Sequence, residues 1–176
     1  MSDRKGLVLV FTGDGKGKTT AALGLALRAV GHGMRVLVLQ FVKGGWETGE
    51  IKAAAGLAGL EIRSVGAGFV HPGEEQGLSR HREAAGQALA EARAALQSGL
   101  HDLVILDEAL CALGLSLVSL EELLTLISLR PPGMHLVLTG RGAPPEIVAR
   151  ADLVTEMREV KHPYHAGIAA QRGIEF

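Results

Sequence analysis

The chain has 176 residues, a hydrophobic fraction of 47% and a single cysteine, so we expect one domain with a substantial core and no internal disulfide. Lysine and arginine number 18 against 19 aspartates and glutamates, a balance that gives no net field for attracting nucleic acid or a membrane surface. The sequence holds no apolar run of membrane-spanning length and no secretory signal pattern, so we expect a cytoplasmic protein.

Apolar runs of strand length alternate with helical patterns along the chain. Continuous hydrophobicity in these runs is typical of parallel strands that helices cover on both faces. The pattern therefore predicts a single α/β domain over residues 1–176 with a mainly parallel six-stranded sheet. The predicted strands are 7–11, 36–41, 60–65, 103–106, 136–138 and 153–157, and the predicted helices are 18–31, 47–56, 75–98, 119–129 and 144–150.

A glycine-rich loop follows the first predicted strand directly and leads into the first helix. A strand, loop and helix of this kind bind a nucleotide triphosphate, because the loop N–H groups and the helix N-terminus face the phosphates. Lys18 would supply a cation and Thr19 a hydroxyl for Mg²⁺, whereas Lys16 could equally face water. The predicted phosphate-binding residues are Gly13, Asp14, Gly15, Lys16, Gly17, Lys18, Thr19 and Thr20.

The spacing of this loop departs from the usual pattern. Three residues separate Gly13 from Gly17, where the standard loop has four. A shortened loop can hold its phosphates differently, so the spacing alone does not favour an ordinary kinase or ATPase.

Paired carboxylates follow the predicted strand 103–106. An acidic residue at a strand tip beside a phosphate loop holds Mg²⁺ in nucleotide-binding folds of this type. Adjacent residues of a strand point in opposite directions, so Asp107 and Glu108 are expected to have different roles. From the sequence alone, either carboxylate could be the metal ligand.

Further polar groups lie at or after the ends of other predicted strands. A triphosphate needs several cations, and the carboxyl ends of parallel strands would bring such groups together. Each of them alone could equally be a solvated surface group, and Arg28 could reach the nucleotide or cover apolar surface with its stem. These candidates are Gln40, Lys43, Thr139, Arg141, Arg158, Lys161 and His162.

Histidine and aromatic residues give weaker signals. The histidines show no metal-ligand spacing, and Pro163 argues against a helix that would align His162 with His165. The glycine-rich stretch 66–77 is predicted to be a functional loop. Its Phe69 could stack on a flat ligand or simply anchor the loop.

Taken in order, these blocks resemble the ATP:corrinoid adenosyltransferases of cobalamin biosynthesis and salvage, in the family associated with the aerobic pathway. The resemblance covers nearly the whole chain, which makes it far more specific than the loop alone. The blocks that carry it are residues 10–22, 28–33, 40–44, 68–69, 106–108, 139–142 and 160–162.

The resemblance implies a P-loop (RecA-like) fold and a reaction other than phosphoryl transfer. ATP would bind with Mg²⁺ or Mn²⁺, and a corrinoid reduced to Co(I) would attack the ribose 5′ carbon while triphosphate departs. Lys18 and Glu108 would be the catalytic residues that neutralise the leaving group, with Thr19 and Glu108 as metal ligands. The resemblance also implies nucleotide contacts for Arg28, and for the strand-end residues Arg141, Lys161 and His162 it agrees with the strand-end argument.

The resemblance also implies partners for the corrinoid half of the reaction. Phe69 and His71 would close over the lower face of the corrin, and His71, where relatives carry tryptophan, could stack on the ring or approach cobalt as a ligand. An electron donor such as a flavoprotein and a homodimeric assembly are expected on the same basis. The rival readings are a small P-loop kinase or NTPase and a nucleotide-binding regulator without turnover.

Overall fold

A six-stranded parallel sheet forms the centre of the protein. The computed structural model describes residues 5–44, 48–68 and 75–175, and the five strand pairings in it are all parallel. The strand order is β3-β2-β4-β5-β1-β6. The predicted α/β fold is therefore confirmed. The strands are β1 (Val8–Thr12), β2 (Val36–Gln40), β3 (Leu60–Ser64), β4 (Leu103–Asp107), β5 (His135–Thr139) and β6 (Leu153–Glu156).

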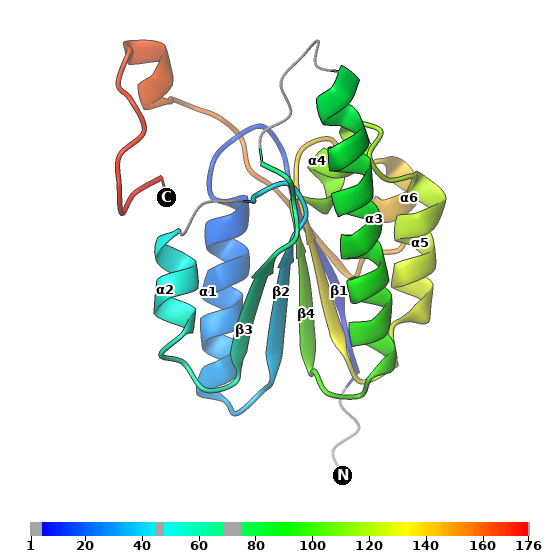
Figure 1. Cartoon of the computed structure of the whole chain (residues 1–176). Coiled ribbons are helices and arrows are strands. Elements are labelled where there is room, and N and C mark those ends of the chain that lie inside the picture. The colour runs from blue at the N-terminus through cyan, green and yellow to red at the C-terminus, as the bar shows by residue number, and fades with distance from the viewer. Residues whose placement is uncertain (1–4, 45–47, 69–74, 176) are drawn as a thin grey trace.

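Helices cover both faces of this sheet. Figure 1 shows α1 and α2 on one face and the layer that contains α3 and α5 on the other. Two apolar clusters fill the space between the layers, one packed on α1 and the other on α3, α4 and α5. The helices are α1 (Lys18–Gly31), α2 (Gly49–Ala54), α3 (Glu75–Gln97), α4 (Ala109–Gly114), α5 (Leu120–Leu129) and α6 (Pro145–Val148), with a 3-10 turn η1 (Pro163–Ala166).

Burial differs between the central and the edge strands. All five residues of β2 and of β4 are buried, as their continuous apolar runs predict. The expectation that every strand is covered on both faces is wrong at the edges. All four residues of β6 are exposed, and three of the five in β3 are exposed. An edge strand has a neighbour on one side only, and its place in the sheet is a long-range property that a local run of residues does not encode.

Some predicted elements differ from the structure in number or extent. The structure adds α4 and η1 to the predicted helices, and α2 is shorter than the predicted 47–56. The argument from Pro163 against a helix is also wrong, because this proline occupies the first position of η1. A missing N–H costs nothing there, since the first N–H groups of a helix have no partner within it. The capping box of Ser119 and Glu122 is confirmed at the start of α5.

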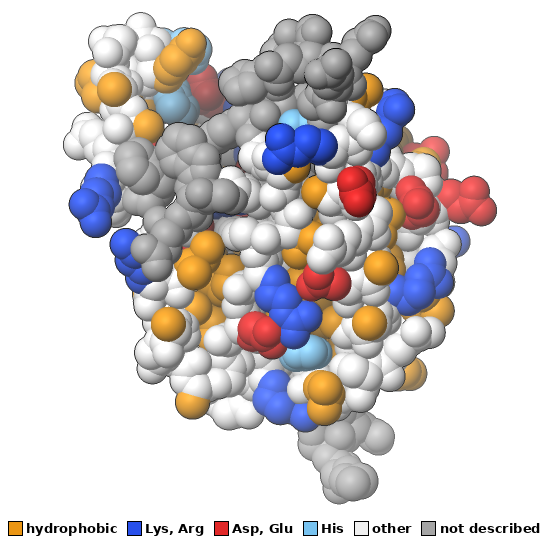
Figure 2. All heavy atoms as spheres, viewed as in Figure 1, with side chains coloured by type: hydrophobic (Ala, Val, Ile, Leu, Met, Phe, Trp, Pro, Cys, Tyr) orange, Lys and Arg blue, Asp and Glu red, His pale blue; other side chains and the backbone are white. Residues whose placement is uncertain are grey.

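The carboxyl ends of the strands lie along one edge of the sheet, at the top of Figure 1. β5 separates β1, which carries the glycine loop, from β4, which ends in the paired carboxylates. On the face drawn in Figure 2, basic and acidic side chains are interspersed over the described residues. Within residues 5–44, 48–68 and 75–175, no helix combines the length and the apolar character needed to cross a membrane.

Candidate functional site

The glycine loop between β1 and α1 packs against the chain that leaves β6. The Gly15 N–H donates to the Met157 carbonyl at 2.7 Å. A Cβ on Gly13 would lie 2.5 Å from the same carbonyl oxygen, so only glycine allows this approach. Gly13 and Gly17 also have φ values of 94° and 107°, a region that favours glycine. The glycines therefore serve the packing of the loop as well as its curvature.

Lys18 is the first residue of α1, and its side chain folds back over the loop. Nζ donates to the carbonyl oxygens of Gly13 and Gly15, each at 2.7 Å. Burial lowers the pKa of this ammonium, and the nearby charge of Arg141 acts in the same direction. An ammonium has three N–H groups, so one is left to donate to a phosphate.

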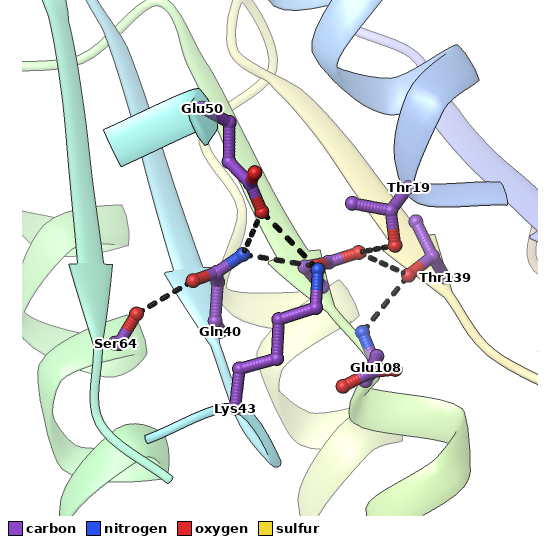
Figure 3. Close-up of polar contacts among 8 residues, drawn as sticks. Thr19, Gln40, Lys43, Glu50, Ser64, Glu108 and Thr139 are labelled. Carbon is purple, nitrogen blue, oxygen red and sulfur yellow. Dashed lines mark hydrogen bonds and ion pairs between the residues drawn. The ribbon is translucent and has the colours of Figure 1, made fainter. Parts of the chain in front are cut away.

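Asp107, the last residue of β4, is fully buried and accepts hydrogen bonds from two hydroxyls. Thr19 Oγ1 donates to its Oδ1 at 2.8 Å, and Thr139 Oγ1 donates to the same oxygen at 2.7 Å (Figure 3). A carboxylate that no water reaches needs such donors. A hydroxyl and a carboxylate oxygen thus meet beside the glycine loop.

The polar cluster continues across the ends of β2 and β3. Gln40 is also fully buried, and its Nε2 donates to Asp107 Oδ2 at 3.4 Å and to Glu50 Oε1 at 3.5 Å. Its Oε1 accepts from Ser64 Oγ at 2.6 Å. Lys43 Nζ lies 3.3 Å from Glu50 Oε1 and 3.9 Å from Asp107 Oδ2. Figure 3 shows these side chains converging from the ends of β2, β3 and β4, from α2 and from the chain that follows β2.

Glu108 has an unusual backbone and a perturbed carboxyl. Its φ of 61° lies in the left-handed region, and its N–H donates to Thr139 Oγ1 at 2.8 Å. Burial raises the pKa of the Glu108 carboxyl and the adjacent Asp107 charge adds to the rise, whereas Lys43 and Lys18 oppose it. Strained backbone and a perturbed pKa are both features that gather at functional sites.

The oxygen ligands at the loop fit a magnesium ion. Thr19 and Glu108 are the predicted ligands, but the structure places Asp107 in hydrogen-bond contact with Thr19. Among the described residues, no three His, Cys, Asp or Glu side chains are grouped so as to hold a metal. Mg²⁺ in nucleotide sites uses one or two carboxylates together with phosphate and water oxygens, so a hydroxyl and carboxylate pair suffices on the protein side.

The structure brings Arg141 to the loop and gives the loop residue Lys16 an acidic partner. Arg141 lies beside Asp14, with Nη2 donating to its carbonyl at 3.5 Å and Nε lying 3.9 Å from its carboxylate. Lys16 forms an ion pair with Glu175 from the C-terminal segment. Thr20, the last residue of the predicted set, is exposed in the first turn of α1.

Arg28 lies far along α1 from the loop, and Lys161 and His162 lie in the segment just before η1. Arg28 is exposed in the last turn of α1, about 15 Å along the helix axis from Lys18. Lys161 is exposed, and His162 Nδ1 accepts from the Tyr164 N–H at the start of η1. The two predicted corrinoid-binding residues, Phe69 and His71, lie outside the described residues.

The structure adds side chains to the site that the sequence-based predictions did not assign to nucleotide or metal, and it gives partners to two strand-end candidates. Polar residues at the ends of continuous apolar strands are a usable signal, because a buried polar group needs partners. That signal applies to Gln40 and Thr139, which were predicted as strand-end candidates beside the triphosphate and which the structure places in hydrogen bonds with Asp107. Glu50 and Glu175 carry no such signal, since each reaches the site through the packing of a distant segment.

Comparison with known proteins gives a consistent result over almost the whole chain. The family described as ATP:corrinoid adenosyltransferase BtuR/CobO/CobP matches residues 4–176. A protein of Escherichia coli K12 named corrinoid adenosyltransferase is 39% identical over 174 residues, which cover 99% of this chain and 87% of that protein. A protein of the same name from Pseudomonas aeruginosa is 41% identical over 176 residues, covering 99% and 85%. The named relative CobA of Salmonella typhimurium matches at 39% with 99% and 87% coverage.

Proposed function

The chain belongs to the ATP:corrinoid adenosyltransferase family, and we propose that its glycine loop and the adjacent strand ends bind ATP for this reaction. The enzyme transfers the 5′-deoxyadenosyl group of ATP to a corrinoid in cobalamin metabolism. The family match over residues 4–176 is the observation that carries this conclusion.

The reaction requires little acid–base catalysis from the protein. Co(I) of the corrinoid supplies the electron pair that forms the bond to C5′, and the C5′–O bond breaks so that triphosphate leaves with its pair. The nucleophile belongs to the substrate, so no side chain must remove a proton. The protein has to position C5′ and to stabilise the charge that develops on the departing triphosphate.

We assign that charge stabilisation to the residues at the glycine loop. Lys18 keeps one N–H free of the loop carbonyls, and we propose that it donates to the triphosphate. Thr19 and a strand-end carboxylate would hold Mg²⁺ or Mn²⁺, with Asp107 favoured by its contact with Thr19 and Glu108 kept as the second candidate. A bound divalent ion would neutralise phosphate oxygens at the leaving group.

Arg141, Lys16 and the loop backbone are proposed as the remaining nucleotide contacts near the loop. Arg141 already lies beside Asp14, and Lys16 would exchange Glu175 for a phosphate. Arg28, Lys161 and His162 remain predicted nucleotide contacts. Phe69 and His71 remain the proposed corrinoid contacts.

Assembly, location and reduction are further proposals of the same kind. The family resemblance favours a homodimer in the cytoplasm and an external electron donor such as a flavoprotein. Support for a dimer comes from β6, which lies at the sheet edge with Leu153 and Val154 exposed at 42% and 39%. Light scattering of the purified protein at several concentrations would measure the assembly directly.

One anaerobic assay separates the proposed function from its rivals. The protein is supplied with MgATP and cobalamin that has been reduced chemically to Co(I). The proposal predicts the absorption spectrum of a cobalt–carbon bond together with inorganic triphosphate. ADP and phosphate without that spectrum would identify an NTPase, and binding of ATP without any product would identify a regulator.

A further inference from the structure

A surface pocket lies at the edge of the sheet where β2, β3 and β4 begin, opposite the edge that carries the glycine loop. Figure 1 shows these strand starts at the bottom of the view. A strand of five residues is about 16 Å long, so the pocket is remote from the proposed phosphate contacts. Its volume is about 230 Å³, and its walls include Arg35, Val36, Leu60, Glu61, Leu100 and His101.

Arg35 is held in a fixed position at this pocket. Its Nε donates to Asp102 Oδ2 at 3.2 Å, and its Nη2 donates to the Gly99 carbonyl at 3.2 Å. The backbone N–H of Arg35 donates to the same Asp102 oxygen at 2.9 Å. A guanidinium has five N–H groups, so these contacts of the described residues leave three for another acceptor. A guanidinium held in this way is a good partner for a planar carboxylate.

His101 adds an imidazole to the same pocket. Its Nδ1 is buried and, within the part of the chain that the structure describes, has no hydrogen-bond partner. A buried polar atom of this kind is uncommon in a folded protein and calls for an explanation. The ring can turn about its Cβ–Cγ bond without breaking a hydrogen bond at Nδ1. An imidazole N–H can therefore be directed to a ligand beside Arg35.

Asp102 and Glu61, the carboxylates beside the pocket, already have basic partners. Asp102 accepts from Arg35, and Glu61 Oε1 accepts from Arg63 Nε at 2.6 Å. The hydrogen bond from Arg63 lowers the pKa of the Glu61 carboxyl, so this group is ionised at neutral pH. A cationic ligand would have to compete with these partners, whereas an anion meets unused N–H groups. The charge of Glu61 repels a dianion more strongly than a monoanion.

Apolar side chains complete the pocket. Val36 is buried, Leu60 is half-buried and Leu100 is 61% exposed. A short hydrocarbon chain would cover this apolar surface, and inorganic phosphate would not. Sites for drug-sized ligands have volumes of about 300–1,000 Å³, so a pocket of about 230 Å³ suits a smaller molecule.

We propose that this pocket binds a small monocarboxylate with a short aliphatic chain. The carboxylate accepts hydrogen bonds from Arg35 and His101, and the chain lies against Leu60 and Leu100. This site is separate from the glycine loop, so the inference does not depend on the proposed function.

The test is a titration of the intact protein with sodium butyrate at neutral pH. Nuclear magnetic resonance follows the signals of the His101 ring and the Leu100 methyl groups. These signals should shift and saturate, with a dissociation constant of about 1 mM for a ligand of this size. Butylamine has the same chain with a cationic head, and inorganic phosphate is an anion without a chain. Neither should produce a saturable shift of both signals.

Three variants address the parts of the pocket separately. Arg35→Gln removes a charged donor and should weaken butyrate binding about tenfold or more. His101→Leu removes the imidazole and should weaken it about fivefold. Leu100→Ala shortens an exposed side chain and should weaken butyrate about threefold while leaving acetate unchanged. Arg150→Gln makes the same charge change at an exposed arginine outside the pocket and should leave butyrate binding unchanged.

Specific results would overturn the inference. One is the absence of a saturable shift at butyrate concentrations well above the expected dissociation constant. Another is equal binding of butyrate and butylamine, and a third is an equal effect of Arg35→Gln and Arg150→Gln. If Arg35→Gln fails to fold, His101→Leu and Leu100→Ala decide the question, and unchanged butyrate binding in both would refute the site.

Discussion

Replacing Lys18 with alanine gives the sharpest test of the assigned charge stabilisation. The substitution removes the cation from the loop and both hydrogen bonds to the carbonyl oxygens of Gly13 and Gly15. Losing one preorganised donor at a developing charge lowers kcat about 10²–10³-fold. Without these two hydrogen bonds the loop is also less well ordered. A loss of about 1.4 kcal/mol in the free energy of MgATP binding would raise the KM for MgATP about tenfold.

The assay follows formation of the cobalt–carbon bond from preformed Co(I), so that the reduction step does not enter the measured rate. Lys5→Ala is the matched control, because this lysine is 78% exposed and pairs with Asp152 at the opposite end of the sheet. The melting temperature of each variant is measured alongside its kinetics. A Lys18→Ala protein that is folded and keeps kcat within about tenfold of the wild type would refute the assigned role.

The remaining predictions concern four other side chains. Asp107→Asn should raise the Mg²⁺ concentration for half-maximal activity about tenfold or more, since the neutral amide loses a charged contact worth about 1.5–3 kcal/mol. Glu175→Gln should lower the KM for MgATP a few-fold, because a partly exposed ion pair worth about 0.2–1 kcal/mol no longer competes for Lys16 of the loop. Phe69→Ala should slow reaction from Co(II) with a weak reductant more than reaction from preformed Co(I). Glu108→Gln should raise the melting temperature at neutral pH. The folded carboxyl titrates above its ordinary value of 4.5, so the wild type loses stability as pH rises through that window and the variant does not.

For each of these variants, a control or a specific result would contradict the prediction. An unchanged Mg²⁺ requirement in Asp107→Asn would move the metal role to Glu108. Glu159→Gln removes an acidic partner of His165 from the same C-terminal segment and should leave the KM unchanged, so equal effects in both glutamate variants would point to net charge. Equal losses from Co(II) and Co(I) would assign Phe69 to anchoring its loop. A Glu108→Gln protein with the wild-type pH dependence of melting would contradict the raised pKa.

The fold could be predicted because its main determinant is local. The runs that form β2 and β4 are continuous and apolar, and both strands are buried throughout. The exposure of β3 and β6 could not be predicted in the same way, since it depends on the order of the strands. That order places residues far apart in the chain side by side, as in the pairing of Leu9 with Leu153.

The residues of the site likewise fall into those that local sequence positions and those that packing positions. The loop residues Lys18 and Thr19 belong to one short motif, and their positions relative to each other are set by the turn and the start of α1. The choice between Asp107 and Glu108 depends on hydroxyls that lie 88 and 32 residues away in the sequence. The ion pair of Glu175 with the loop likewise depends on how the C-terminal segment returns to β1. Such contacts are consequences of packing, which residue types at a given spacing do not reveal.

The central claim is that the glycine loop binds and stabilises a leaving triphosphate. The stoichiometry of the products tests this claim most directly. Cob(I)alamin and MgATP are mixed with the protein anaerobically, and cobalt–carbon bonds and phosphorus-containing products are counted in the same sample. One intact triphosphate is expected for each cobalt–carbon bond formed, and no ADP. Release of ADP and phosphate in place of triphosphate, or cobalt–carbon bonds without matching triphosphate, would contradict it.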